Sequence, residues 1–465
     1  MKVKRQHDSH PIKKLLAGEL RLNPEGYGFF ISKDRTVPDV FVPARHINHA
    51  MNGDEIMVEA QKNKRDGRFE GSVVKILRRA QSTVIGRIER HGDEYYLRTF
   101  DRASQFELHI PEKNLHGAQR GHYAVAKILQ YPAAGVLPVG EVSQVIGDEV
   151  NLPNLTQAVL LKFNIGEDFP HNVKEEIKTV PQQVDKTDLN HGRVDLTDLP
   201  FITIDGITAK DFDDAVCVRK RGKDYVLYVS IADVSAYVEK GSTLDQEAYQ
   251  RGTSVYLPHL CIPMLPSVLS NGVCSLNPHE WRKTITAEIH YDGKFHLTRV
   301  IFYRSLIRSQ KRATYEEVEA FFDRTGDEIW PEAVRKSLGF MKELATQLIK
   351  QATARGSLGF DLPEAKVIFD AQGHVQNIVR SQSLFSHKLI EVFMVAANEA
   401  VASFFSLNGV PGMYRVHDEP DPMKMQNFVQ LVKALGLWQK TNSPLSDFFK
   451  HIKGHSHETF LHSVF

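Results

Sequence analysis

Residues 199–214 read Leu-Pro-Phe-Ile-Thr-Ile-Asp-Gly-Ile-Thr-Ala-Lys-Asp-Phe-Asp-Asp. Four carboxylates therefore fall within ten residues, directly after an apolar run: Asp205, Asp211, Asp213 and Asp214. Apolar residues such as Ile204 and Phe212 lie between the acids and must pack while the carboxylates converge. Crowded carboxylates repel one another, and burial raises their pKa values, so a fold that holds them together usually offsets the charge with a bound cation. The segment predicts a metal site.

The ligand chemistry of this segment indicates which metal it would hold. It offers only carboxylate oxygen, with no His or Cys. Oxygen ligands suit Mg²⁺, with Mn²⁺ as the alternative, and fit Zn²⁺ poorly. Because Mg²⁺ typically pairs carboxylates with substrate phosphates, the sequence predicts phosphoryl transfer or phosphodiester hydrolysis. A solvated acidic loop or a structural Ca²⁺ site is the alternative, although the Asp spacing does not match a helix-loop-helix Ca²⁺ loop.

The composition is that of an ordinary globular protein. The chain has 465 residues, of which 42% are hydrophobic and 25% charged, enough for roughly three domains. It contains no run of 18 apolar residues and no apolar segment behind its N-terminal charges, so we expect no membrane span, no signal peptide and a cytoplasmic location. We also expect a monomer. Cys217, Cys261 and Cys274 lack metal-ligand spacing, and we expect reduced thiols in the core.

Charge is unevenly distributed along the chain. Residues 1–80 contain 16 Lys and Arg against 10 Asp and Glu, a net charge of +6, whereas the whole chain carries only +1. A basic region that precedes an acidic site suggests a polyanion that is held by one part and cut by another. The alternative is that these charges only increase solubility.

The first 150 residues contain an internal repeat with a spacing of 68 residues. Gly18, Asp39-Val-Phe-Val-Pro43 and Gly53 recur as Gly86, Glu107-Leu-His-Ile-Pro111 and Gly121, and Tyr27 maps onto Tyr95. Short alternating strands broken by Gly and Pro predict that each copy is a small Greek-key barrel. We expect one barrel over residues 1–80, a second over 81–150, and an irregular connector over 151–190.

Aromatic residues are concentrated in the strands of the first copy. Gly26-Tyr-Gly-Phe-Phe30 and Asp39-Val-Phe-Val-Pro43 resemble the paired nucleic-acid motifs of cold-shock domains, whose rings stack unpaired bases. We therefore expect Tyr27, Phe29 and Phe41 to bind single-stranded nucleic acid, although strand alternation places some of the phenylalanines in the core. The second copy has Glu94-Tyr-Tyr-Leu-Arg98 at this place, which weakens the case for binding there.

Helices and strands alternate after residue 190. We expect a strand over 225–233, a hairpin over 284–303 that turns at Asp292-Gly293, and a helix that begins with the capping box Thr314-Tyr-Glu-Glu317. One apolar helix face is predicted to be core: Val334, Leu338, Met341, Leu344 and Leu348. His457 and His462 are five residues apart, which on a helix is the wrong spacing for a zinc-protease motif.

Several longer motifs resemble one enzyme family. The aspartate segment, Arg251-Gly-Thr-Ser-Val-Tyr256, the segment 262–271 and Cys274-Ser-Leu-Asn277 are similar to the catalytic domain of the ribonuclease II/ribonuclease R family of processive 3′→5′ exoribonucleases, and closer to its ribonuclease R branch. Two cold-shock domains before the nuclease domain are also the family's order. The resemblance implies a multidomain fold, with two all-β OB-fold barrels followed by an α+β RNB-type nuclease domain over 191–465.

The resemblance also implies roles for individual residues. The four aspartates match those that hold Mg²⁺ and orient the attacking water, while Tyr256 and Phe360 match the aromatic pair that clamps the 3′-terminal nucleotides. Glu391 and Arg415 lie in segments that match the RNA channel. The implied substrate is single-stranded RNA, which is shortened by one nucleoside 5′-monophosphate at a time. Without the family, Tyr256 and Phe360 would be interpreted as core residues.

In two respects the chain departs from the family pattern. The N-terminal helix-turn-helix region that is common in ribonuclease R is missing or vestigial, and the C-terminal part differs as well. The family's catalytic domain continues beyond the equivalent of residue 465, into an arginine motif that stabilises the transition state and a C-terminal OB-fold domain. We therefore expect a nuclease domain that is incomplete at its C-terminus, with reduced activity. The alternative function is a non-catalytic single-stranded RNA-binding protein that keeps the cold-shock domains.

Overall fold

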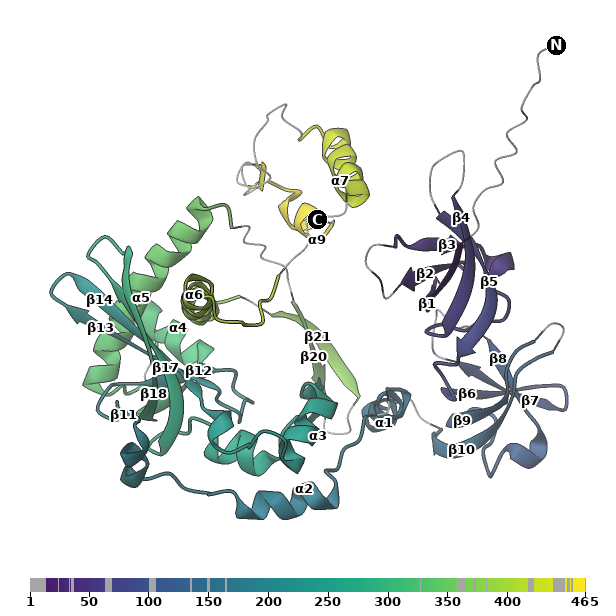
Figure 1. The fold of residues 1–465 in the computed structure, drawn as a ribbon, viewed down its shortest axis with the longest axis horizontal. Helices are drawn as coiled ribbons and strands as arrows, with labels where there is room; N and C mark the ends of the chain where they lie inside the picture. Colours follow the sequence, from purple (N-terminus) through teal and green to yellow (C-terminus); the bar gives the residue numbers. More distant parts are fainter. Residues whose placement is uncertain are drawn as a thin grey trace, which may run out of the picture. The chain divides into compact units, whose positions relative to one another are not determined.

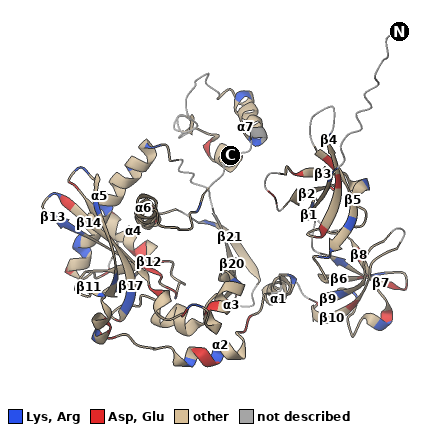
Figure 2. Cartoon of the chain, viewed as in Figure 1, with Lys and Arg blue, Asp and Glu red and all other residues tan. Residues whose placement is uncertain are grey.

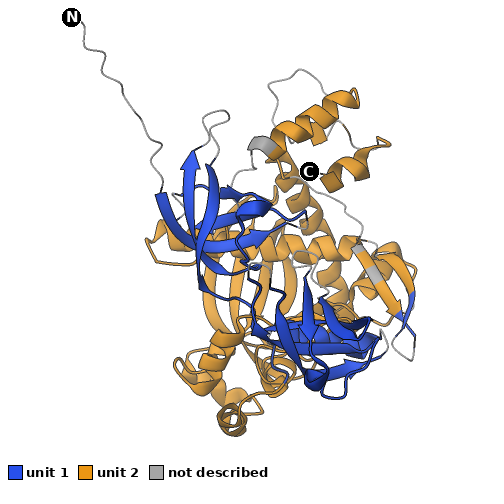
Figure 3. Ribbon diagram, turned by 90° about the vertical axis from the view of Figure 1, so that its right-hand side faces the viewer, with its two compact units in different colours: residues 1–167, 369–376 blue, residues 168–368, 377–465 orange. Residues whose placement is uncertain are grey.

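The computed structural model describes residues 14–464 except for short gaps, which are 24, 33, 35–36, 63–68, 100–105, 134–135, 149–150, 164, 327, 358–363, 371–373, 382, 417–421, 438–447, 450–451 and 453–454. Two compact units are present: one comprises residues 1–167 and 369–376, and the other comprises 168–368 and 377–465 (Figure 3). Basic and acidic residues are interspersed over both units (Figure 2).

The first unit begins with a closed five-stranded barrel (Figure 1). Its strands are β1 (Lys14–Leu22), β2 (Gly28–Ser32), β3 (Val40–Val42), β4 (Glu55–Lys62) and β5 (Phe69–Arg78). Alternate residues such as Leu20, Phe30 and Val40 are fully buried inside it. Gly18 lies where β1 pairs with β2, and a Cβ atom there would stand 2.3 Å from the Ile31 carbonyl oxygen. This close approach explains why the repeat keeps a glycine at this position.

A second closed barrel follows it. Its strands are β6 (Thr83–His91), β7 (Glu94–Thr99), β8 (Glu107–Ile110), β9 (Tyr123–Gln130) and β10 (Val139–Gly147). Gly86 repeats the role of Gly18, because a Cβ atom there would lie 2.1 Å from the Arg98 carbonyl oxygen. The two barrels predicted from the repeat are confirmed.

The segment that follows the barrels is more regular than expected. Helices α1 (Leu152–Lys162) and α2 (His171–Glu176) lie within 151–190, so the expectation of irregular structure there was wrong. Asn151 caps α1 by accepting a hydrogen bond from the Asn154 backbone N–H, and Pro153 occupies the first turn. Asn and Pro are common in loops, but at a helix N-terminus both residues are favourable.

The second unit is built on a seven-stranded mixed sheet with the order β11-β18-β17-β14-β13-β12-β19. The strands are β11 (Val194–Asp195), β12 (Ile202–Asp205), β13 (Asp214–Arg221), β14 (Asp224–Ala232), β17 (Trp281–Tyr291), β18 (Leu297–Arg308) and β19 (Lys311–Thr314). Successive residues of the central strands enter opposite cores. Val216 and Val218 pack in one core, whereas Ala215 and Cys217 pack in the other. Such a sheet is covered on both faces.

Helices α4 (Tyr315–Asp323), α5 (Glu332–Ala354) and α6 (Phe385–Leu407) cover one face of the sheet (Figure 1). The other face is covered by α2, α3 (Thr243–Arg251) and the turn of helix Val268–Val273. The remaining described strands form two small hairpins, β15 (Val255–Leu257) with β16 (Leu260–Ile262) and β20 (Glu364–Phe369) with β21 (Val375–Ser381), and the remaining described α-helices are α7 (Pro422–Ala434) and α9 (Glu458–Val464).

Most local expectations for this unit are confirmed. The strand at 225–233 is β14, the hairpin is β17 with β18, the capping box at Thr314 opens α4, and all five residues of the predicted stripe are buried on α5. Cys261 differs, because it is exposed on β16 while Cys217 and Cys274 are buried. Its place in a short surface hairpin explains why the core expectation was wrong there.

Helix α6 is long and apolar enough to cross a membrane by length and composition alone. One such helix is weak evidence, because the core helix of a soluble protein passes the same test. Leu389, Ile390 and Phe393 of α6 are buried in the core beside the sheet.

Candidate functional site

The four aspartates lie around the connection between two neighbouring strands. Asp205 is the last residue of β12 and Asp214 is the first residue of β13, and the two strands pair antiparallel. Asp211 and Asp213 lie in the loop between them. Asp213 is exposed and the other three are half-buried. The structure therefore brings the aspartates to one end of the sheet, with one side of the group open to solvent.

The pKa values of three of these carboxylates are raised. Burial raises the pKa of Asp205 to about 7, and the charge of Asp214 adds to the shift. Burial, with Asp213 nearby, raises the pKa of Asp214 to about 6. The pKa of Asp213 is raised in the same direction by desolvation and by Asp211. Mutual repulsion and desolvation together make this an anionic site whose charge a cation would relieve.

The loop that carries Asp211 is fastened from two sides. The Ser275 Oγ atom accepts a hydrogen bond from the Phe212 backbone N–H (3.0 Å) and donates one to the Lys210 carbonyl oxygen (2.9 Å). From β19, the Arg312 guanidinium donates to the carbonyl oxygens of Gly206 (2.9 Å) and Ile207 (2.8 Å). These contacts fix the backbone on both sides of Asp211.

Neither Ser275 nor Arg312 was predicted as a site residue. Ser275 is fully buried, and its own carbonyl oxygen accepts a 2.6 Å hydrogen bond from Arg282. It lies in the motif Cys274-Ser-Leu-Asn277, so that motif was the available signal. The positive charge of Arg312 also acts on Asp205, where it opposes the rise in the carboxyl pKa.

Tyr256 lies beside the aspartates. Its hydroxyl donates a 2.7 Å hydrogen bond to Asp211 Oδ2, while the side chain remains 67% exposed. Tyr315, the first residue of α4, is a further neighbour that the sequence reasoning missed. Burial raises its pKa to about 12, with contributions from Asp205 and Asp214, and its ring stacks on His387 at a centroid distance of 4.0 Å.

The other predicted RNA-contacting residues of this unit are placed as follows. Glu391 is exposed on α6, one turn beyond His387. Arg415 is exposed in the segment after α6. Phe360 lies outside the described residues.

The first barrel presents a cluster of three rings. Tyr27, Phe29 and Phe41 have centroid distances of 5.5–5.8 Å from one another. Phe29 is 39% exposed and pairs with Phe41 across β2 and β3, whereas Phe30 points inward and is fully buried. Strand alternation thus separates the phenylalanines into one core residue and two that face outward with Tyr27.

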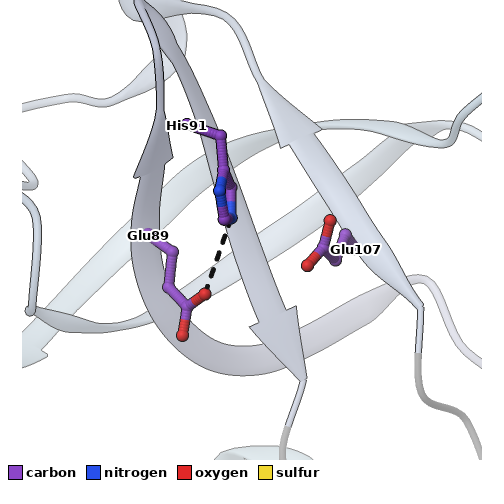
Figure 4. Close-up of side chains that lie close together, drawn as sticks. All are labelled: Glu89, His91 and Glu107. Carbon is purple, nitrogen blue, oxygen red and sulfur yellow. Dashed lines mark ion pairs between the residues drawn. The ribbon is translucent and has the colours of Figure 1, made fainter.

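The corresponding face of the second barrel is chemically different. Tyr96 pairs with His109, so these two residues occupy the places of Phe29 and Phe41. The His109 ring lies 2.6 Å from a Glu94 oxygen. Glu89, His91 and Glu107 lie on the same face, and among the described residues this is the one group of three potential metal ligands whose atoms all lie within 4.8 Å of one another (Figure 4). Exposed groups of this kind are common without a metal.

The donor chemistry of the aspartate site fits Mg²⁺ or Mn²⁺. All four side chains offer carboxylate oxygen, and the raised pKa values of Asp205, Asp213 and Asp214 indicate that the protein does not fully offset their charge. The carboxylates are more widely spaced than a closed three-ligand cage. Mg²⁺ usually binds through one or two carboxylates, with water and substrate phosphates as further ligands, and such binding needs no closed cage.

Comparison with known proteins places these features in a family. The chain combines two OB-type barrels with a mixed-sheet domain that carries an acidic site. Family models for an RNB domain match residues 193–464, for a Ribonuclease B OB domain 18–76, and for a cold shock domain 96–170. The chain therefore belongs to the RNB-domain ribonuclease II/R family, and the predicted fold class of two barrels before an α+β RNB domain is confirmed.

Individual relatives agree with this assignment. The chain is 38% identical over 434 residues to Ribonuclease R of Thermotoga maritima, covering 92% of this chain and 60% of that protein. It is 34% identical to Ribonuclease R of Escherichia coli K12, covering 91% and 52%. The structure of Mycoplasma genitalium RNase R in complex with ribose methylated single-stranded RNA is similar with a TM-score of 0.86 and 26% identity, covering 97% and 72%. The chain thus spans between half and two thirds of the length of these two curated relatives.

Proposed function

We propose that this chain acts in a cytoplasmic, monomeric 3′→5′ exoribonuclease that uses Mg²⁺, or Mn²⁺, to release nucleoside 5′-monophosphates from single-stranded RNA. The observation that carries the proposal is the convergence of Asp205, Asp211, Asp213 and Asp214 around the connection from the end of β12 to the start of β13, with three carboxyl pKa values raised. The similarity to the RNase R structure in complex with RNA supports the choice of substrate.

The residues of the site have distinct roles in this proposal. The aspartates would hold the divalent ion, which supplies Lewis-acid stabilisation of the phosphate oxygens when bound. Ser275 and Arg312 keep the loop in place, so that the ligands need not reorganise as charge develops. The exposed ring of Tyr256 is available to stack on a nucleotide base next to the site. Asp213, the exposed member of the group, faces the solvent side from which RNA would approach.

A second candidate function is supported by the first barrel. The ring cluster Tyr27, Phe29 and Phe41 would bind single-stranded RNA by stacking whether or not the aspartate site is active. The fold itself does not decide between these functions. A yeast protein with the same fold, Ssd1, described as a pseudonuclease, has a TM-score of 0.73 at 16% identity.

The substitution Asp213→Asn tests the two candidates. It removes one charge and keeps the shape, so labelled single-stranded RNA in Mg²⁺ should decay with the parent chain and persist with the variant. RNA affinity in chelator should be nearly equal for the two. Asp224→Asn is the matched control, because Asp224 is exposed at the start of β14, away from the site.

Each result has a clear meaning. Equal decay by parent and Asp213→Asn would show that these aspartates are not the catalytic ligands. A parent that binds RNA but leaves it intact would favour the non-catalytic candidate.

A further inference from the structure

Tyr256 combines an exposed ring with a hydroxyl that contacts the aspartate site. Its ring is two-thirds exposed, which leaves a face open for stacking, yet its hydroxyl is committed to a 2.7 Å hydrogen bond with Asp211 Oδ2. A tyrosine that only stacked on bases would have no need of this hydroxyl. The contact joins a surface ring to one of the four carboxylates of the site.

The hairpin that carries Tyr256 is anchored through residues next to it in the chain. In the preceding segment, the Ser254 Oγ atom accepts a hydrogen bond from the Met264 backbone N–H (3.0 Å). The Arg251 guanidinium donates to the Asp168 carbonyl oxygen (2.8 Å) and lies 3.9 Å from the Phe169 ring centroid. These contacts hold β15 and β16 in place, so the phenol reaches Asp211 from a fixed support.

Asp211 depends on such a partner more than Asp205 and Asp214 do. The backbones of those two belong to strands and are held by the sheet ladder through the partners Thr314 and Ile231. Asp211 lies in the loop, where Ser275 and Arg312 fix the neighbouring backbone but not the Asp211 carboxylate. The Tyr256 hydroxyl acts on the carboxylate itself.

We propose that the Tyr256 hydroxyl is a positioning group that orients the Asp211 carboxylate as a metal ligand, while the ring of the same residue remains free to stack on a nucleotide. The proposal rests on the proposed function, because it requires a metal at the aspartates. Hydrogen-bond partners of metal ligands fix ligand orientation, and their loss typically lowers metal affinity about 10–100-fold. A carboxylate oxygen can accept the phenol and still leave lone pairs for a metal ion. Ring placement and ligand orientation are thereby linked through one side chain.

The test separates the hydroxyl from the ring. Tyr256→Phe removes the hydroxyl and keeps the ring, whereas Tyr256→Leu removes both. Tyr249→Phe is the matched control, because Tyr249 is 89% exposed on α3. Mn²⁺ affinity of the full chain is measured without RNA from the electron paramagnetic resonance signal of free Mn²⁺. Affinity for a single-stranded oligoribonucleotide is measured separately in chelator.

We expect Tyr256→Phe to lower Mn²⁺ affinity about tenfold and to leave RNA affinity within twofold of the parent. Tyr256→Leu should lower both affinities, and Tyr249→Phe neither. The proposal is wrong if Tyr256→Phe binds Mn²⁺ like the parent. It is also wrong if Tyr256→Phe loses RNA affinity to the same extent as Mn²⁺ affinity, since the hydroxyl would then hold the ring and not the ligand.

A comparison with Asp213→Asn distinguishes failure of this inference from failure of the proposed function. If neither Asp213→Asn nor Asp205→Asn lowers the Mn²⁺ affinity of the parent, the metal site itself is refuted, and the role of Tyr256 with it. If Asp213→Asn loses Mn²⁺ but Tyr256→Phe does not, the metal site stands and only the positioning role is refuted.

Discussion

The ring cluster of the first barrel leads to a quantitative prediction for RNA binding. Stacking of a base on an aromatic side chain contributes about 1–3 kcal/mol, and about 1.4 kcal/mol corresponds to a tenfold change in affinity. Phe29 is 39% exposed and contacts two other rings, so we place Phe29→Ala toward the lower part of this range, at about a tenfold loss. Phe41→Ala should have a similar effect. The double variant should lose less than the sum, because the two rings touch.

The assay is fluorescence anisotropy with a labelled single-stranded oligoribonucleotide and a fragment of residues 1–167, which contains both closed barrels with their own cores. Affinity should fall with rising salt and depend little on base sequence. Tyr96→Ala on the second barrel is the matched control and should cost less. Phe30→Ala should instead destabilise the first barrel by about 3–5 kcal/mol, because Phe30 is fully buried. Unchanged RNA affinity in both Phe29→Ala and Phe41→Ala would refute the stacking role.

Two further predictions concern the aspartate site. Ser275→Ala leaves the Phe212 N–H and the Lys210 carbonyl without their hydroxyl partner, so the free energy of unfolding measured in urea should fall by about 1–3 kcal/mol. Mn²⁺ affinity should also fall, because the loop that carries Asp211 is held less firmly. An unchanged unfolding midpoint would contradict this prediction. Addition of Mg²⁺ at about 100 times its dissociation constant should stabilise the parent by about 2.7 kcal/mol, seen as a higher melting temperature that chelator reverses and Asp213→Asn lacks.

The fold of the barrels was predictable because the repeat encodes it directly. The repeated glycines occupy points of close backbone approach, and the alternating apolar residues fill each barrel. The sequence offset nevertheless aligned Tyr27 with Tyr95, whereas strand pairing places Tyr96 opposite His109 as Phe29 lies opposite Phe41. The second copy has one residue fewer between Gly86 and Tyr96 than the first copy has between Gly18 and Phe29. A one-residue shift changes which face a strand residue occupies, so only the register shows the match.

The aspartate site was predictable in part, for a similar reason. Its four acids are close in sequence, so their spacing alone indicates convergence. The groups that hold the loop of the aspartates are far from it in sequence, since Ser275 is 63 residues from Phe212 and Arg312 is 106 residues from Gly206. Both act on backbone atoms, which every residue has, so no pattern of side chains along the chain marks their targets. The hydrogen bond from the Tyr256 hydroxyl to Asp211 joins residues 45 positions apart, so the sequence did not predict it either.

The arrangement around the loop explains how four carboxyl groups can be held together before a metal binds. Hydrogen bonds from Ser275 are neutral and directional, so they fix the backbone without changing the charge of the site. Arg312 adds one positive charge, which opposes the rise in the pKa of Asp205 but does not cancel it, since that pKa still reaches about 7. A second arginine in direct contact would satisfy the carboxylates and compete with a cation. The protein thus fixes the geometry with backbone contacts and leaves the negative charge largely unpaired, which is the condition a site must meet to attract a divalent ion and the phosphates that accompany it.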